Sequence, residues 1–280
     1  MKTATTRSEL RQARAELPHP VGFVPTMGFL HPGHLSLVRM AREQCASAVV
    51  SIFVNPTQFN APEDLESYPR DAERDLRMLE AEGVDLVWLP TPEIIYPAGF
   101  QTWINVEEVS RPLEGAHRPG HFRGVATVVA KLFHAVQPAR AYFGQKDAQQ
   151  VRVIQRMVQD LDFPIAIEVG ATVREPDGLA MSSRNHHLSP EERQAAAVLS
   201  RALALARTAY RTGTDRAEEL RAVLQDVLRG EPRATVDYVS CADPETLEEL
   251  EGPVEHGLLS LAVTVGRTRL IDNEILRRCS

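Results

Sequence analysis

The sequence predicts an α/β protein, with an N-terminal domain built on a parallel sheet and a smaller C-terminal α+β domain. Three observations lead to this prediction. Apolar runs alternate with amphipathic helical patterns over residues 1–173, and two helices with an apolar hairpin follow over residues 174–280. The chain of 280 residues is also long enough for about two domains.

In the N-terminal domain, helical and strand patterns alternate. Helices are expected at residues 8–17, 34–45, 71–82, 125–136 and 146–161, and strands at 21–24, 48–54, 84–89, 102–106, 141–143 and 165–169. Strands separated by helices imply right-handed crossovers and a mostly parallel sheet covered on both faces, a Rossmann-like layout. Ligands of such sheets bind beyond the carboxyl ends of the strands.

The C-terminal domain follows a different pattern. The letters SPEE at residues 189–192 combine a capping box with proline at the first helical position, and they start a long helix expected to end near residue 211. A second helix is expected at residues 215–228. Strands at 235–240, 258–265 and 268–271 follow, the last two joined at Gly266-Arg267 as a hairpin.

Composition narrows the class of protein. A net charge of -7 argues against a general nucleic-acid binder, while a local basic pocket for phosphates stays possible. No apolar run approaches the roughly 20 residues that a membrane span needs, and no signal-like apolar stretch follows Met1. Cys45, Cys241 and Cys279 are too few and too scattered for a disulfide framework or a zinc site. We therefore expect a cytoplasmic protein that does not associate with membranes.

The stretch VGFVPTMGFLHPGHLSLVRMA, residues 21–41, places His31 and His34 around Pro32-Gly33 where an apolar strand turns into a helix. A helix N-terminus carries unpaired N–H groups and a partial positive charge, so it is a natural anion site. Gly28 and Gly33 would let the backbone approach a phosphate group. The alternative is a capped turn with two solvated imidazoles.

Three further segments concentrate polar side chains. Asn55 and Gln58 follow the strand at 48–54, although such amides also satisfy loop backbone. Lys146 lies at the start of a helix, where the helix dipole disfavours a cation. A bound polyphosphate would reverse this penalty. The alternative is a solvated lysine paired with a nearby acid. The letters MSSR at 181–184 combine two hydroxyls with a guanidinium and suit phosphate, although a mobile interdomain linker has a similar composition.

The segments PTMGFLHPGH, FVNPTQF, YPR, HFRGVATVV, YFGQKDAQQ and MSSRN occur in this order. With these separations, the chain resembles the pantothenate synthetase (pantoate–beta-alanine ligase) family of the HIGH-type nucleotidyltransferases over nearly its whole length. It departs from the familiar pattern at Gln145, where many members have Glu, and at Phe29, a variable position. Neither residue is assigned to proton transfer, so these departures concern only details of nucleotide contacts.

The resemblance implies an ATP-dependent ligase that works in two steps. The carboxylate of pantoate attacks the α-phosphate of ATP, giving pantoyl adenylate and pyrophosphate, and the amine of beta-alanine then displaces AMP to form pantothenate. Adenylation supplies a leaving group that a bare carboxylate lacks, and water must be kept from the mixed anhydride. Mg²⁺ is expected with ATP, and Asp75 is the best candidate for a protein ligand. The resemblance also implies a homodimer.

The same resemblance assigns individual residues. His34 is the proton donor, and His31, Lys146 and Arg184 complete the catalytic set. Gln58 and Gln150 hold pantoate, and Gln58 also contacts beta-alanine. The nucleotide site consists of Met27, Gly28, Phe29, Leu30, His31, Pro32, Gly33, His34, Gly144, Gln145, Lys146, Asp147, Val173, Met181, Ser182, Ser183 and Arg184. Residues 1–173 are then the ATP- and pantoate-binding domain, and residues 174–280 a lid.

Two other functions fit parts of the sequence. A HIGH-type enzyme that transfers AMP to a phosphate ester would not need the paired amides Gln58 and Gln150. A catalytically silent nucleotide-binding or scaffold protein would be favoured by the loss of His34, Lys146 or Arg184, and all three residues are present.

Overall fold

The structure is a computed structural model that describes residues 1–60 and 62–278, so Cys279 lies outside the described residues. Contacts divide the chain into two units. The N-terminal unit contains Met1–Gln145 and Gln150–Ala171, and the C-terminal unit contains Lys146–Gln149 and the residues from Thr172 onward. The short segment Lys146–Gln149 therefore belongs with the C-terminal unit, although the chain on both sides of it belongs with the N-terminal unit.

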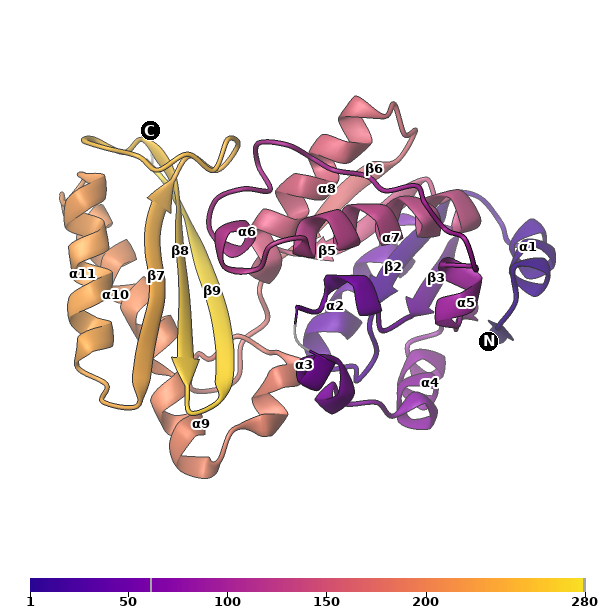
Figure 1. Ribbon diagram of the computed structural model, residues 1–280, viewed down its shortest axis with the longest axis horizontal. Coiled ribbons are helices and arrows are strands. Elements are labelled where there is room, and N and C mark those ends of the chain that lie inside the picture. Colours follow the sequence, from indigo (N-terminus) through magenta and orange to yellow (C-terminus); the bar gives the residue numbers. More distant parts are fainter. Residues whose placement is uncertain (61, 279–280) are drawn as a thin grey trace. The chain divides into compact units, whose positions relative to one another are not determined.

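The N-terminal unit is a six-stranded sheet with the order β1-β4-β3-β2-β5-β6 (Figure 1). All its pairings are parallel, which confirms the predicted α/β class. The strands are β1 (Lys2–Ala4), β2 (Val21–Thr26), β3 (Ser47–Ile52), β4 (Leu86–Trp88), β5 (Arg140–Gly144) and β6 (Ala166–Gly170). The helices are α1 (Arg7–Ala15), α2 (Pro32–Gln44), α3 (Pro62–Ser67), α4 (Ala72–Ala81), α5 (Pro92–Ile95), α6 (Glu114–His117), α7 (His121–Val136) and α8 (Ala148–Asp160), with 3₁₀ turns η1 (Pro56–Gln58) and η2 (Gln145–Asp147).

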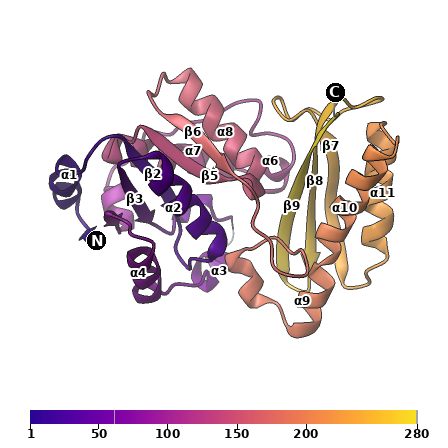
Figure 2. The same ribbon diagram turned by 180° about the vertical axis from the view of Figure 1, so that it is seen from behind.

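Strand β2 is the centre of this sheet. In the register, Phe23 lies opposite Val49 of β3 on one side and Ala141 of β5 on the other. Helices α2 and α7 both contact β2 and cover opposite faces of the sheet. Helix α7 lies in front of the sheet in Figure 1, and α2 lies in front of it in Figure 2. The apolar residues at the centre of β2 and β3 are fully buried, so both faces of these strands are covered; they are Val21, Phe23, Val24, Ala48, Val49 and Val50. The chain thus leaves β2 at a switch point between two neighbouring strands.

The C-terminal unit confirms the predicted α+β arrangement. Its antiparallel sheet has the order β7 (Ala234–Ala242), β8 (His256–Val265), β9 (Thr268–Arg277). The helices α9 (Pro190–Ala196), α10 (Val198–Arg211) and α11 (Ala217–Arg229) precede it, with a 3₁₀ segment η3 (Ser183–His187). Its core is formed where the apolar stripes of α10 and α11 meet the sheet, and it includes the fully buried Leu199, Leu220, Leu224 and Leu261.

Several local expectations were wrong or incomplete. Residues 102–106 do not form a strand, because the N–H of Ile104 donates to Thr127 Oγ1 of α7 at 3.0 Å instead of to a neighbouring strand. The helix expected from 189 to 211 is divided at Ala197 into α9 and α10. Strand β1 was missed because three residues show no periodicity. Strand β9 continues beyond residue 271 to Arg277, since its polar residues still pair with β8.

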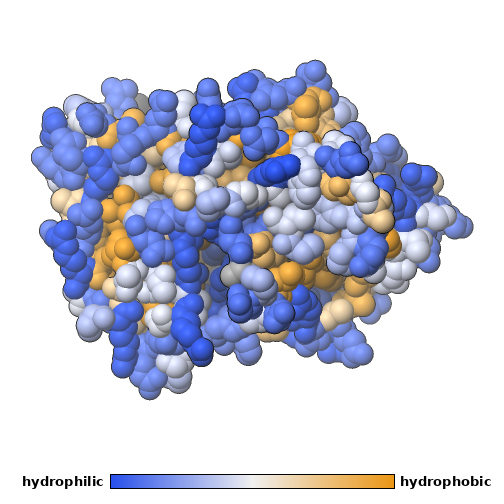
Figure 3. Space-filling model, viewed as in Figure 1, coloured by the Kyte–Doolittle hydropathy of each residue, from blue (hydrophilic) through white to orange (hydrophobic). Residues whose placement is uncertain are grey.

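The apolar side chains gather in the cores of the two units. On the face seen in Figure 3, hydrophilic residues cover most of the surface and apolar residues occur in separate patches. Within the described ranges, no helix combines the length and the apolar character that crossing a membrane requires.

Candidate active site

Residues 27–31 connect β2 to α2 in a tight loop with two successive left-handed residues. Gly28 has a φ of 83° and Phe29 a φ of 48°. A Cβ at position 28 would lie 2.9 Å from Ile52 Cγ2 and 3.1 Å from Asp75 Oδ2, so glycine is required by both conformation and space. The Thr26 hydroxyl accepts the N–H of Gly28 at 3.2 Å and donates to a carbonyl of β3 at 2.8 Å. The end of β2 therefore dictates the path of the loop.

Asp75, at the start of α4, holds this loop from the side. Its two carboxylate oxygens accept the N–H groups of Phe29 and Leu30 at 2.7 and 2.8 Å, and Asp75 is fully buried. The neighbouring Arg74 donates to the carbonyl of Leu30 at 2.9 Å and lies 5.2 Å from the Phe29 ring centroid. Burial raises the pKa of Asp75, although the two N–H donors and Arg74 oppose this shift. The Asp75 carboxylate therefore binds the backbone of the loop between β2 and α2.

This arrangement does not fit the expected role of Asp75 as a ligand of Mg²⁺. Both of its oxygens are engaged by backbone N–H groups. In addition, the described residues contain no group of three or more His, Cys, Asp or Glu side chains that could hold a metal ion.

His31 and His34 form the N-terminus of α2. His31 is the N-cap residue, and its Nδ1 accepts the N–H of Gly33 at 3.2 Å. His34 Nδ1 accepts the N–H of His31 at 3.3 Å, which completes a reciprocal capping box, and the two ring centroids lie 4.0 Å apart. A nitrogen that accepts an N–H is unprotonated, so in each neutral ring the proton is on Nε2. The pair is thus a reciprocal helix cap made by Nδ1 of each ring.

Gln58 lies in η1, directly after β3. Its Nε2 donates to Met27 Sδ at 3.1 Å, so the amide sits beside the loop that follows β2. Its Oε1 accepts from Asn55 Nδ2 at 3.0 Å. Asn55 is 1% exposed, and its Oδ1 accepts from the hydroxyls of Thr57 and Tyr96 at 3.0 and 2.8 Å. Asn55 is therefore engaged by neighbouring side chains, and it orients Gln58.

Helix α7 supports this segment by direct backbone contact. Asn55 Nδ2 also donates to the carbonyl of Gly124 at 3.3 Å. A Cβ on Gly124 would lie only 2.4 Å from the carbonyl oxygen of Thr57, so glycine is what allows α7 to approach η1. The carbonyl of Gln58 is bonded to His121 Nδ1 at 2.8 Å and accepts from Arg118 Nη2 at 3.1 Å. The motif HFRGVATVV thus fixes the position of Gln58.

The two segments that follow β2 and β5 lie at the same edge of the sheet. Gly144 ends β5, and Gln150 lies in the first turn of α8. Strand β2 lies between β3 and β5, so the histidine loop is flanked by the chain of Gln58 on one side and by that of Gln150 on the other. A cavity of about 400 Å³ opens at this edge, lined by residues that include Met27, Phe29, Phe53, Pro56, Leu89 and Asp75. The residues that line it do not include His31, His34 or Gln58.

Lys146 and Asp147 lie in η2 and belong to the C-terminal unit. Lys146 Nζ lies 3.6 Å from Asp147 Oδ1, the acid pairing considered for this lysine. The side chain of Lys146 is only 20% exposed. The half-exposed carboxylate of Asp147 therefore balances the charge of the Lys146 ammonium group.

Hydrogen bonds hold the predicted phosphate loop of the C-terminal unit, residues 181–184. The N–H of Met181 donates to the carbonyl of Val173 at 2.9 Å, which closes a hairpin, and Ser182 Oγ accepts the N–H of Arg184 at 3.3 Å to cap η3. Asn185 Nδ2 donates to Glu175 Oε1 at 2.8 Å. These bonds tie the segment to neighbouring residues of its own unit.

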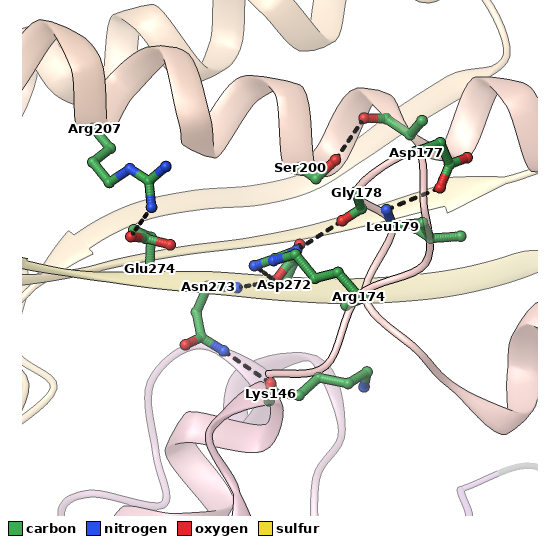
Figure 4. Close-up of polar contacts among 12 residues, drawn as sticks. Lys146, Arg174, Asp177, Gly178, Leu179, Ser200, Arg207, Asp272, Asn273 and Glu274 are labelled. Atoms are coloured by element: carbon green, nitrogen blue, oxygen red, sulfur yellow. Dashed lines mark hydrogen bonds and ion pairs between the residues drawn. The ribbon is translucent and has the colours of Figure 1, made fainter. Parts of the chain in front are cut away.

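Arg174, inside this hairpin, forms an ion pair with the buried Asp272 of β9 (Figure 4). Its two terminal nitrogens donate to the two oxygens of Asp272 at 2.6 and 3.0 Å, and one also donates to the carbonyl of Gly178 at 3.1 Å. The Asp272 side chain is 1% exposed. Burial lowers the pKa of Arg174, but the hydrogen bond and charge of Asp272 outweigh it, so that the pKa lies above its ordinary value.

The predicted site residues fall into two groups. His31, His34, Gln58, Gly144 and Gln150 belong to the N-terminal unit, as do the other residues from 27 to 33 and Gln145. Lys146, Asp147, Val173 and residues 181–184 belong to the C-terminal unit. Sequence reasoning missed the contributions of Tyr96 and Asp272, which support other residues of the segments through long-range bonds and carry no local signal.

A parallel sheet with a histidine-capped helix after its central strand defines a Rossmann-like α/β protein. The family model described as pantoate-beta-alanine ligase matches residues 1–275. The chain belongs to the pantoate-beta-alanine ligase family.

Curated and solved relatives agree with this assignment. The pantothenate synthetase of Herpetosiphon aurantiacus is 58% identical over 277 residues, covering 99% of this chain and 100% of that protein. The crystal structure of pantothenate synthetase from Thermus thermophilus has a TM-score of 0.94 and 50% identity, covering 98% of this chain and 99% of that one. The ligase from Francisella tularensis, complexed with beta-gamma ATP and beta-alanine, has a TM-score of 0.81 and 35% identity over 98% of this chain and 97% of that one.

Proposed function

We propose that this chain condenses (R)-pantoate with beta-alanine, using ATP, through a pantoyl adenylate intermediate and with release of pyrophosphate and AMP. The observation that carries the proposal is the pair of histidines that cap the N-terminus of α2 through Nδ1, with a glutamine amide held against the same loop. Support also comes from the Francisella tularensis ligase, which is complexed with beta-gamma ATP and beta-alanine.

In the first step, a carboxylate oxygen of pantoate attacks the α-phosphorus of ATP and the bond to pyrophosphate breaks. His31 and His34 donate hydrogen bonds to phosphate oxygens on which negative charge increases, and His34 supplies the proton. Lys146 and Arg184 add positive charge, which the helix start then tolerates because a polyphosphate is bound. The nucleotide pocket is also lined by the other residues assigned to it, which are residues 27–33, 144–147, Val173 and 181–184.

In the second step, the amine of beta-alanine attacks the acyl carbon and AMP leaves. Gln58 and Gln150 hold pantoate, and Gln58 also contacts beta-alanine. Neutral amides orient a carboxylate nucleophile without the ion pairing that would hold it back. Residues 1–173 bind ATP and pantoate, and residues 174–280 act as a lid that keeps water from the adenylate.

Mg²⁺ enters as part of the ATP substrate, which is consistent with the engagement of both Asp75 oxygens by the loop backbone. The homodimer and the cytoplasmic location are further predictions, based on the family resemblance and on composition.

The test is product analysis. The protein is incubated with ATP, Mg²⁺ and pantoate, with and without beta-alanine, and products are identified by mass. We expect pyrophosphate and pantoyl adenylate without the amine, and AMP with an equal amount of pantothenate when it is present. Failure to form pantothenate, or AMP transfer to a phosphate ester offered in place of pantoate, would contradict the proposal.

A further inference from the structure

Two neighbouring residues of β9 reach opposite sides of the sheet. In a strand, successive side chains point to opposite faces. Asp272 and Glu274 share one face, where Glu274 accepts from Arg207 of α10 at 2.8 Å. Asn273 points the other way and donates through Nδ2 to the carbonyl of Lys146 at 2.9 Å (Figure 4). Asp272 and Asn273 are 2% and 5% exposed.

Each of these residues is bonded to a segment that carries a cation of the proposed site. Asn273 holds the backbone of η2, which carries Lys146. Asp272 holds Arg174, whose hairpin leads directly to Arg184. The backbone N–H of Asn273 also donates to Asp272 Oδ1 at 2.8 Å, so the Asp272 carboxylate is held to the strand itself as well as to Arg174. A buried amide and a buried carboxylate are strong restraints because leaving either unpaired is costly.

We propose that Asp272 and Asn273 are positioning residues, through which β9 holds Lys146 and the loop of Arg184 as one body. This inference rests on the proposed function for its catalytic consequence. It explains why Lys146–Gln149 belongs with the C-terminal unit although the flanking chain does not. Both cations then depend on the same strand, while the two histidines depend on α2.

The main test is Asn273→Ala, with Glu274→Gln as matched control on the same strand. The ion pair of Glu274 is partly exposed, so its loss leaves Lys146 untouched. In hydrogen exchange without substrates, a peptide spanning residues 141–152 exchanges faster in Asn273→Ala and is unchanged in Glu274→Gln. Adenylation, measured as pyrophosphate release, falls about 10- to 100-fold in Asn273→Ala, the scale of a small misplacement, with the KM for pantoate unchanged.

A double-mutant cycle separates positioning from a general structural role. Asn273→Ala should have little further effect on adenylation in a Lys146→Ala background, whereas its effect should remain in an Arg184→Ala background. The reverse pattern is expected for Asp272→Asn, which should couple to Arg184. Equal effects in all backgrounds, or unchanged exchange of the 141–152 peptide, would overturn the proposal.

The two proposals fail in distinguishable ways. If the wild-type protein releases no pyrophosphate, the proposed function fails while hydrogen exchange still tests the positioning. If Asn273→Ala does not fold, Asn273→Asp removes the same donor with little change of volume, and faster exchange of the same peptide is again expected.

Discussion

At the scale of single residues, the histidines of α2 combine two tasks. Each uses Nδ1 to accept a backbone N–H and keeps its proton on Nε2. The cap and the donor are therefore inseparable in the native side chain, and a substitution that removes both would leave the cause of any lost activity undecided. The residue at position 34 allows the two to be separated, because glutamine is also a favoured residue at N3 of a capping box.

We therefore expect His34→Gln to retain the stability of the fold, while adenylation falls by roughly 10²-fold because the positioned donor is lost. His34→Ala should show the same loss of rate together with a destabilisation of about 1 kcal/mol from the missing cap. Pyrophosphate release and thermal unfolding measure the two effects. His256→Ala, an exposed histidine on β8, is the control. Wild-type turnover in His34→Gln would show that His34 acts only as a helix-capping residue.

At the scale of elements, the start of α4 determines the shape of the loop between β2 and α2. Asp75 satisfies two backbone N–H groups that a left-handed turn leaves without partners in the sheet. A carboxylate can accept both, whereas an asparagine has one oxygen and turns an NH₂ group toward the second donor. The contact thus depends on the charge and symmetry of the carboxylate.

Asp75→Asn should accordingly destabilise the protein by about 1–3 kcal/mol, the cost of a buried donor without a partner. Because residues 28–31 lead into the histidine cap, the KM for ATP should rise several-fold. Denaturant unfolding and initial-rate kinetics measure these effects. Glu73→Gln, exposed on the same helix, should change neither quantity. An unchanged stability in Asp75→Asn would show that the loop holds its conformation without the carboxylate.

Local patterns predicted much of this architecture. Alternating apolar runs identified the central strands, and the capping signals identified α9. The wrong strand at 102–106 shows the limit of that approach, since an apolar stretch forms a strand only when a neighbour offers its backbone. The bonds of Asp75 to Leu30 and of Arg174 to Asp272 join residues 45 and 98 positions apart. No local pattern encodes such contacts, so the residues that support the site could not be predicted.

At the scale of the whole molecule, the proposed chemistry draws on both units. The histidines belong to one, and Lys146 and Arg184 belong to the other. A nucleotide that binds residues of both would couple its own binding to domain closure, and closure would protect the mixed anhydride until the amine arrives.

Arg184→Ala should therefore weaken ATP binding and also increase hydrolysis of the adenylate, seen as AMP formed in excess of pantothenate. Arg201→Ala, an exposed arginine on α10, should keep the two products equal. Solution scattering of the wild-type protein should show compaction when ATP is added. Equal AMP and pantothenate in Arg184→Ala, without compaction of the wild type, would exclude a lid.

The close approach of α7 to η1 also limits the substitutions that this protein can accept during evolution. Position 124 has no room for even one additional carbon, since Thr57 presents a rigid carbonyl and not a side chain that could rotate away. Any lineage that acquired alanine there would have to displace the segment that carries Gln58. Selection for a new acid substrate is therefore expected to act on residues away from the contact between α7 and η1, and position 124 should change least.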